Sequence, residues 1–183
     1  MNKDKTKVIA INSISGGGKT TTTNELLKEI PNSKALYFDD RDYASESGIL
    51  DLCKWELEDG SDYGLWNLQA LADDITHLMQ ENLDYIFLDY PFGYLQKQIS
   101  SFISLSILID TPLDMAVARR ILRDFKNKSV NDITNDMEWY LKRGRESYIN
   151  SIKTSHVDAD FIVDGSLPLD DICNIIIERI KKV

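Results

Sequence analysis

The strongest constraint on the fold is a glycine-rich loop near the N-terminus. Residues 13–20 read Ser-Ile-Ser-Gly-Gly-Gly-Lys-Thr, which matches the phosphate-binding P-loop except at its first position, where Ser13 replaces glycine. The apolar run 7–11 before the loop is typical of a buried strand, and residues 20–30 after it are typical of a helix that Pro31 ends. This strand–loop–helix order favours a true P-loop over the alternative, a glycine-rich turn that only caps a helix.

Each residue type in this loop suits phosphate binding. The three consecutive glycines at 16–18 let backbone N–H groups turn toward an anion with no Cβ in the way. We expect Lys19 to reach the terminal phosphates of ATP and the Thr20 hydroxyl to ligate Mg²⁺. The N-terminus of the following helix adds a partial positive charge. The predicted nucleotide-binding residues of the loop are Ser15, Gly16, Gly17, Gly18, Lys19, Thr20 and Thr21.

Composition excludes several classes of protein. The 183 residues suit one domain, 1–183, and a net charge of −9 argues against a general nucleic-acid binder. The apolar runs are too short to span a membrane, and the charged N-terminus lacks the apolar region of a secretory signal. We therefore expect a cytoplasmic protein with small-molecule ligands and neither nucleic-acid nor membrane partners. The sequence does not indicate an oligomeric state.

Short apolar strands alternate with helices along the chain. Apolar residues recur at helical spacing over 65–79, Thr111 and Pro112 open a helix through 115–125, and further helices are expected over about 134–154 and over 169–180. This alternation predicts a mainly parallel sheet that is covered on both faces. The predicted strands are residues 8–12, 35–38, 85–89, 104–110 and 159–163.

Carboxylates at the ends of these strands are candidates for metal binding and catalysis. Asp89 ends a strand where a P-loop protein commonly places its second Mg²⁺ ligand, and Asp110 competes with it at the end of the next strand. Asp39, Asp40 and Asp42 follow the second strand, at the edge of the sheet where ligands bind in doubly wound folds, and Asp39 and Asp40 are predicted to contact the substrate. One of these three is predicted to accept a proton from a substrate hydroxyl, and the alternative is that all three are solvated loop residues.

Five arginines flank the polar segment 127–135. Arg119 and Arg123 are four residues apart and therefore share a helix face, where their guanidinium groups are expected to bind the phosphates of ATP. This predicts a lid over about residues 119–145 that is mobile around 127–135, whereas surface ion pairs are the alternative. Aromatic residues crowd the middle of the chain, where core packing is the default. Of these, Tyr43, Tyr90 and Phe92 are predicted to line an acceptor pocket.

Several segments resemble the uridine kinase and phosphoribulokinase group of P-loop kinases. The phosphate loop 14–21 is similar, and Phe-Asp-Asp-Arg-Asp-Tyr at 38–43 resembles an acidic–aromatic segment whose first aspartate is that group's general base, which implies Asp39. Ile-Asp-Thr at 109–111, followed by Ala-Arg-Arg-Ile-Leu-Arg-Asp at 118–124, resembles the lid-entry helix whose arginines grip ATP. The chain departs from the group at Ser13, at Asp89-Tyr-Pro in place of Glu-Gly, and over 41–64, the region that would determine the acceptor.

Together these features predict a P-loop NTPase fold, a three-layer α/β/α sandwich with a five-stranded parallel sheet in the order 2-3-1-4-5 and a small helical lid. The predicted reaction transfers the γ-phosphate of ATP to a hydroxyl of a nucleoside or similar metabolite. A nucleotide-dependent regulatory protein is one alternative, although the stretch 127–130 lacks the aspartate of an Asn-Lys-x-Asp motif. A nucleoside monophosphate kinase is another, and it would want arginines within 39–64, where Arg41 stands alone.

Overall fold

The computed structural model describes residues 6–39, 43, 49, 52–58 and 61–183. Within them, five strands form one parallel sheet in the order β2-β3-β1-β4-β5. The fold class and the strand order are therefore as predicted, and strand bounds differ from the expected ones by at most two residues. The strands are β1 (Lys7–Asn12), β2 (Ser33–Tyr37), β3 (Tyr85–Asp89), β4 (Ile103–Asp110) and β5 (Phe161–Asp164).

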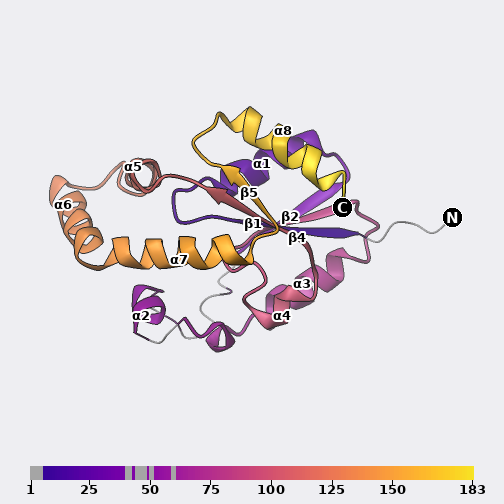
Figure 1. Cartoon of the computed structure of the whole chain (residues 1–183), viewed down its shortest axis with the longest axis horizontal. Helices are drawn as coiled ribbons and strands as arrows, with labels where there is room; N and C mark the ends of the chain where they lie inside the picture. The colour runs from indigo at the N-terminus through magenta and orange to yellow at the C-terminus, as the bar shows by residue number, and fades with distance from the viewer. Residues whose placement is uncertain (1–5, 40–42, 44–48, 50–51, 59–60) are drawn as a thin grey trace.

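Helices cover both faces of this sheet (Figure 1), which completes the three layers. The helices α1 (Lys19–Glu29) and α8 (Leu169–Ile180) lie on one face, and α3 (Gln69–Leu78) and α4 (Lys97–Ser100) lie on the other. Between β2 and α3 the described part of the chain forms α2 (Leu52–Leu57) and a 3₁₀ turn, η2 (Tyr63–Leu65). The helix expected over 65–79 is therefore shorter than predicted and begins only at Gln69.

Side-chain alternation along the strands divides the core into two clusters. In β1, Ile9 and Ile11 are buried among residues of α1 and α8, whereas Val8 and Ala10 are buried among residues of α3. All four side chains are fully buried. Because parallel strands covered on both faces have no solvent-facing side, β1 is an almost continuous apolar run.

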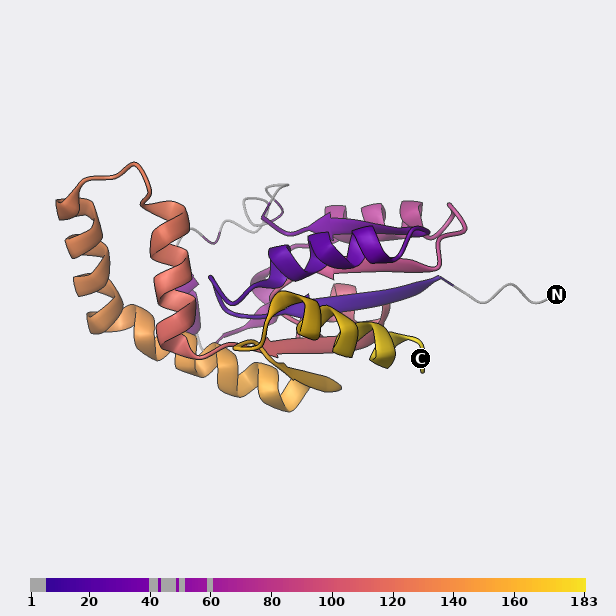
Figure 2. The same cartoon turned by 90° about the horizontal axis from the view of Figure 1, so that it is seen from above.

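The remaining helices form an arm that extends past the carboxyl ends of the strands (Figure 2). It comprises α5 (Leu113–Asp124), α6 (Val130–Trp139), a π-helical turn η3 (Tyr140–Gly144) and α7 (Arg145–Asp158). The helix expected from about residue 134 thus begins at Val130, because Ser129 and Asp132 form a capping box. Most of the polar segment 127–135 is therefore helical. No helix in the described ranges is long and apolar enough to cross a membrane.

Candidate active site

The phosphate-binding loop joins β1 to α1 in the predicted geometry. Gly16 and Gly18 have φ values of 79° and 105°, in the left-handed region that glycine adopts without strain. Gly18 is also the N-cap of α1, so the anion-binding position at the start of this helix carries no side chain. The loop lines a cavity of about 680 Å³ through all residues from Asn12 to Thr22.

The serine that replaces the first loop glycine is matched by a glycine four residues later. Ser13 is buried, and its hydroxyl donates a 2.7 Å hydrogen bond to the carbonyl oxygen of Ile109 in β4. A Cβ on Gly17 would lie 1.9 Å from Ser13 Oγ and 2.9 Å from Ser13 Cβ, closer than atoms can approach. Ser13 therefore occupies space that is left open by Gly17, and a side chain at position 17 would overlap that of Ser13.

Thr20 and Asp89, the two predicted metal ligands, are neighbours in the structure. Asp89 is 3% exposed at the end of β3, and the Thr20 hydroxyl donates a hydrogen bond to Asp89 Oδ2. A hydroxyl and a carboxylate beside a phosphate loop are the oxygen donors that Mg²⁺ prefers, so this pair fits that ion. The competing Asp110 lies elsewhere: its Oδ2 is 2.8 Å from His156 Nε2, and it borders a separate hollow beside β5.

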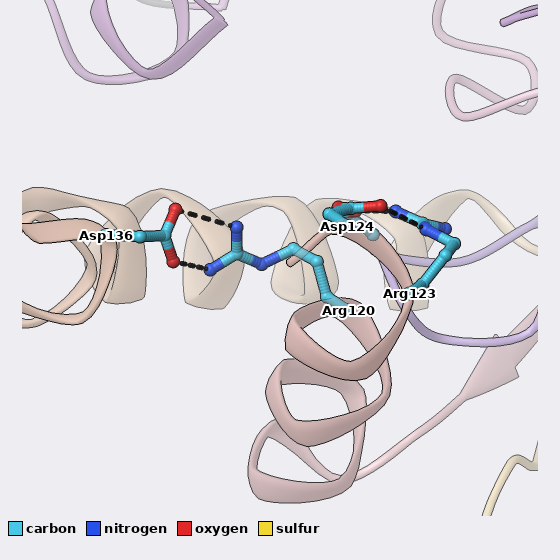
Figure 3. Close-up of polar contacts among 5 residues, drawn as sticks. Arg120, Arg123, Asp124 and Asp136 are labelled. Atoms are coloured by element: carbon cyan, nitrogen blue, oxygen red, sulfur yellow. Dashed lines mark hydrogen bonds and ion pairs between the residues drawn. The ribbon is translucent and has the colours of Figure 1, made fainter. Parts of the chain in front are cut away.

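Two arginines of α5, four residues apart on one helix face, line the cavity. Arg119 and Arg123 both contribute to its wall, and Arg119 Nη1 donates a 3.4 Å hydrogen bond to the carbonyl of Gly165. Arg120, on the other side of α5, is buried and pairs through both terminal nitrogens with Asp136 of α6 (Figure 3). Arg120 thus ties the two arm helices together.

The far end of the cavity is lined by Asp39 and by aromatic side chains. Asp39 is exposed and follows β2 after Phe38, at the carboxyl edge of the sheet. The aromatic wall is built around Phe92, whose ring centroid lies 4.9 to 5.9 Å from those of five other rings. Phe38, Trp55, Tyr63 and Phe92 all face the cavity.

Two predicted acceptor-pocket residues lie in the core instead. Tyr43 is 3% exposed and its hydroxyl donates to Asp74 of α3, while Tyr90 is 1% exposed and packs on Phe38 and Phe92. Neither lines the cavity in the described part of the chain. The predicted substrate residue Asp40, and Asp42 beside it, lie outside the described residues.

A buried carboxylate at this end was missed in the sequence. Glu56 of α2 is 9% exposed and lines the cavity. Its Oε2 accepts a 3.1 Å hydrogen bond from Ser151 of α7, whereas its buried Oε1 has no hydrogen-bond partner among the described residues. Burial raises the pKa of Glu56 above its usual 4.5. In the sequence, the pattern that could have indicated Glu56 as a site residue is the pair Trp55-Glu56, in which an acidic residue follows an aromatic one.

Three serines of α7 were also missed, and a simple spacing identifies them. Ser147, Ser151 and Ser155 follow one another at intervals of four, so they share one helix face, and all three line the cavity. Ser155 accepts a 2.9 Å hydrogen bond from the side chain of Asn12 at the end of β1. These short side chains leave room beside the phosphate loop and hold α7 against the sheet.

Comparison with known proteins agrees with this geometry. A sequence profile of the phosphoribulokinase / uridine kinase family matches residues 67–172, more than half of the chain. The uridine kinase of Borrelia duttonii (strain Ly) is 27% identical over 86% of this chain and 85% of the relative. The uridine kinase of Staphylococcus haemolyticus (strain JCSC1435) is also 27% identical, over 82% of this chain and 80% of the relative.

Solved structures share the fold at low sequence identity. Thymidylate kinase from Candida albicans superposes with a TM-score of 0.59 at 14% identity, over 97% of this chain and 92% of that chain. Deoxyadenosine kinase from M. mycoides gives 0.54 at 16% identity, over 96% and 100%. The chain therefore belongs to the phosphoribulokinase / uridine kinase family, and it is an ATP-dependent P-loop kinase that phosphorylates a hydroxyl group.

Proposed function

We propose that this kinase transfers the γ-phosphate of ATP to a hydroxyl of a nucleoside. The observation that carries the proposal is one continuous cavity of about 680 Å³. It joins the phosphate loop at one end to an aromatic wall with two carboxylates, Asp39 and Glu56, at the other. A planar base fits between aromatic rings, and sugar hydroxyls are donors that suit carboxylates.

At the phosphate end, the loop residues divide the work of binding ATP. Backbone N–H groups over 16–20 hold the phosphate oxygens, and Lys19 neutralises their charge. Thr20 and Asp89 would hold Mg²⁺, which when bound supplies charge stabilisation at the phosphate oxygens. The site therefore acts mainly by positioning and electrostatics, which is what phosphoryl transfer requires.

Asp39 is the proposed general base. Its exposed carboxylate follows a sheet strand and faces the same cavity as the phosphate loop. In the proposed step, the acceptor hydroxyl gives its proton to this carboxylate while its oxygen bonds to the γ-phosphorus. The bond from that phosphorus to the bridging oxygen breaks, and ADP leaves with the bond's electron pair.

The arm acts in this proposal as a lid over about residues 119–145. Arg119 and Arg123 approach the phosphates from α5, where they stabilise charge on the transferred group. The Arg120–Asp136 pair makes α5 and α6 one unit, because removing either partner would leave a buried charge uncompensated. We expect the lid to close as a helical unit rather than as a loose loop.

Charge favours a nucleoside over a nucleoside monophosphate as the acceptor. The cavity's described cationic side chains are Lys19, Arg119 and Arg123, which belong to the phosphate loop and α5. The aromatic end carries Glu56 and Asp39, which would repel the phosphate of a monophosphate. The similarity to uridine kinases supports uridine as the first nucleoside to test.

The test is a panel assay of ADP formation and phosphorylated product with uridine, cytidine, purine nucleosides, nucleoside monophosphates and simple sugars. We expect one or more nucleosides to be phosphorylated, with transfer by the Lys19→Ala variant nearly abolished. Phosphorylation of monophosphates in preference to every nucleoside would overturn the proposal, as would exclusive phosphorylation of sugars.

A further inference from the structure

The two arginines shown in Figure 3 pair with aspartates in different ways. Arg120 uses its two terminal nitrogens: Nη1 donates to Asp136 Oδ1 at 3.0 Å and Nη2 donates to Asp136 Oδ2. Arg123 instead uses its side edge: Nε donates to Asp124 Oδ1 at 2.6 Å and Nη2 donates to Asp124 Oδ2 at 3.1 Å. The same pair of residue types therefore leaves different parts of each guanidinium available.

The part that remains on Arg123 is the terminal edge, which can bind a phosphate through two nitrogens. A guanidinium has five N–H donors in a rigid fork, and its two terminal nitrogens match two oxygens of one phosphate. In Arg120, both nitrogens of this edge already donate hydrogen bonds to Asp136. On Arg123, Nη1 donates no hydrogen bond within the described part of the chain, and Nη2 reaches the hydroxyl of Ser15 at 3.3 Å.

This remaining edge faces the reaction site. Ser15 belongs to the loop that holds the phosphates, and both it and Arg123 line the cavity. Hydrogen bonding to Asp124 is the largest cause of the raised pKa of Arg123, and the Asp39 carboxylate makes a smaller contribution. Arg123 therefore lies within electrostatic reach of Asp39, the proposed base on the acceptor side.

We propose that Asp124 is a positioning residue that presents the terminal Nη1/Nη2 edge of Arg123 to the transferred phosphoryl group. Asp124 would not touch the substrate. Its carboxylate fixes the rotation of the guanidinium, so that Nη1 and Nη2 point at the phosphate loop before ATP binds. Arg123 and Asp124 are 60% and 38% exposed, so the pair adds little to stability and its value lies in orientation. This inference rests on the proposed role of Arg123 at the phosphates.

The test is a double-mutant cycle with Asp124→Asn, Arg123→Lys and the combination, measured in single turnover. We expect Asp124→Asn to lower the rate of transfer roughly tenfold, with the KM for ATP changed less than about threefold, because misorientation acts on the transition state. In the Arg123→Lys background, the same change should alter the rate less than about twofold, since its target is gone. Asp114→Asn, at the exposed start of α5, is the matched control and should keep the parent rate.

Each reaction rate is measured with a nucleoside and with water as the acceptor, and thermal unfolding is followed for every variant. If the parent phosphorylates no nucleoside, the proposed function is wrong. The slow transfer of phosphate to water then still measures the effect of Asp124 on the reaction rate. The positioning role is overturned if Asp124→Asn keeps the parent rate. It is equally overturned if the loss is the same factor in both backgrounds, which is what a general folding defect would give.

Discussion

The two ends of the cavity are built on different principles. The phosphate end comes from one continuous segment, residues 13–21, and works largely through backbone groups and a helix N-terminus. The acceptor end is assembled from side chains of the segment after β2, of α2, η2 and α7, and of the turn after β3, which are far apart in the sequence. Backbone geometry is encoded by a short motif, whereas the acceptor end exists only after the chain has folded.

The difference also concerns charge. Lys19 and the α5 arginines make the phosphate end cationic, while Asp39 and Glu56 make the other end anionic. A donor that carries several negative charges and an acceptor that carries hydroxyl groups are thereby directed to opposite ends. Substitutions at the cationic end should therefore impair the use of ATP, whereas substitutions at the anionic end should impair the use of the acceptor.

The largest effect is expected at the phosphate end. Lys19→Ala should reduce phosphoryl transfer by about 10³-fold, because the variant loses the charge that neutralises the terminal phosphates. Lys19 is not part of either core cluster, so the thermal unfolding temperature should stay close to that of the parent. Turnover and unfolding are measured on the same preparation. A fully active variant would remove the loop from the mechanism.

The next largest effect is expected from the proposed base at the acceptor end. Asp39→Asn should lower turnover roughly 10²-fold, since it keeps the size of the side chain but cannot accept the proton. ATP binding should be unchanged, which separates this variant from Lys19→Ala. Asp40→Asn and Asp42→Asn are the matched controls and should remain within a few-fold of the parent. A large loss in either control, with Asp39→Asn nearly active, would move the base to that residue.

A third prediction concerns the packing that supports the phosphate loop. Gly17→Ala should destabilise the protein by about 1–3 kcal/mol and lower activity, because the new Cβ would overlap the Ser13 side chain. Gly17 is not among the glycines with positive φ, so the backbone itself accepts alanine.

Combining Gly17→Ala with Ser13→Gly should restore most of the loss, leaving the cost of the Ser13 hydrogen bond to Ile109, about 1 kcal/mol. Denaturant unfolding of the two single variants and the double variant measures the coupling. Purely additive losses would show that the two positions do not share one space.

The phosphate end and the acceptor end also differ in how well the sequence predicts them. The strands and the loop geometry could be predicted because apolar runs and the glycine pattern are local signals, and the strand order followed from the P-loop fold that the loop indicated. The early start of α6 was missed, although Ser129 and Asp132 carry the spacing of a capping box, because the segment lacks apolar periodicity.

The acceptor end could be predicted only in part, for a physical reason. Tyr90 was assigned to the pocket because it follows Asp89 in the sequence. Its N–H donates to Ile11 in continuation of the β3 ladder, so its side chain alternates away from Asp89, into the core with Leu88. Glu56 was missed because its partner Ser151 lies 95 residues away, a distance that no local pattern reports.

The smallest effects are expected from Glu56, and they test the acceptor end alone. Glu56→Gln should raise the KM for the nucleoside about tenfold, because it replaces a charged acceptor of hydroxyl hydrogen bonds by a neutral one. The KM for ATP should stay within about twofold, since the phosphate end is untouched. Glu58→Gln, an exposed neighbour that pairs with Arg143, is the matched control and should leave both KM values unchanged.

The pH dependence of stability gives Glu56 a second, independent readout. Because burial raises the pKa of Glu56 above 4.5, the folded chain binds this proton more tightly than the unfolded chain does. The resulting stabilisation is complete below pH 4.5 and is lost as the pH rises through the folded pKa. The unfolding temperature of Glu56→Gln should therefore fall less over this window than that of the parent.

A bound nucleoside whose hydroxyls donate to the carboxylate would favour its charged form and reduce the parent's pH dependence toward that of the variant. If saturating nucleoside leaves the difference between the two proteins unchanged, the acceptor does not contact Glu56.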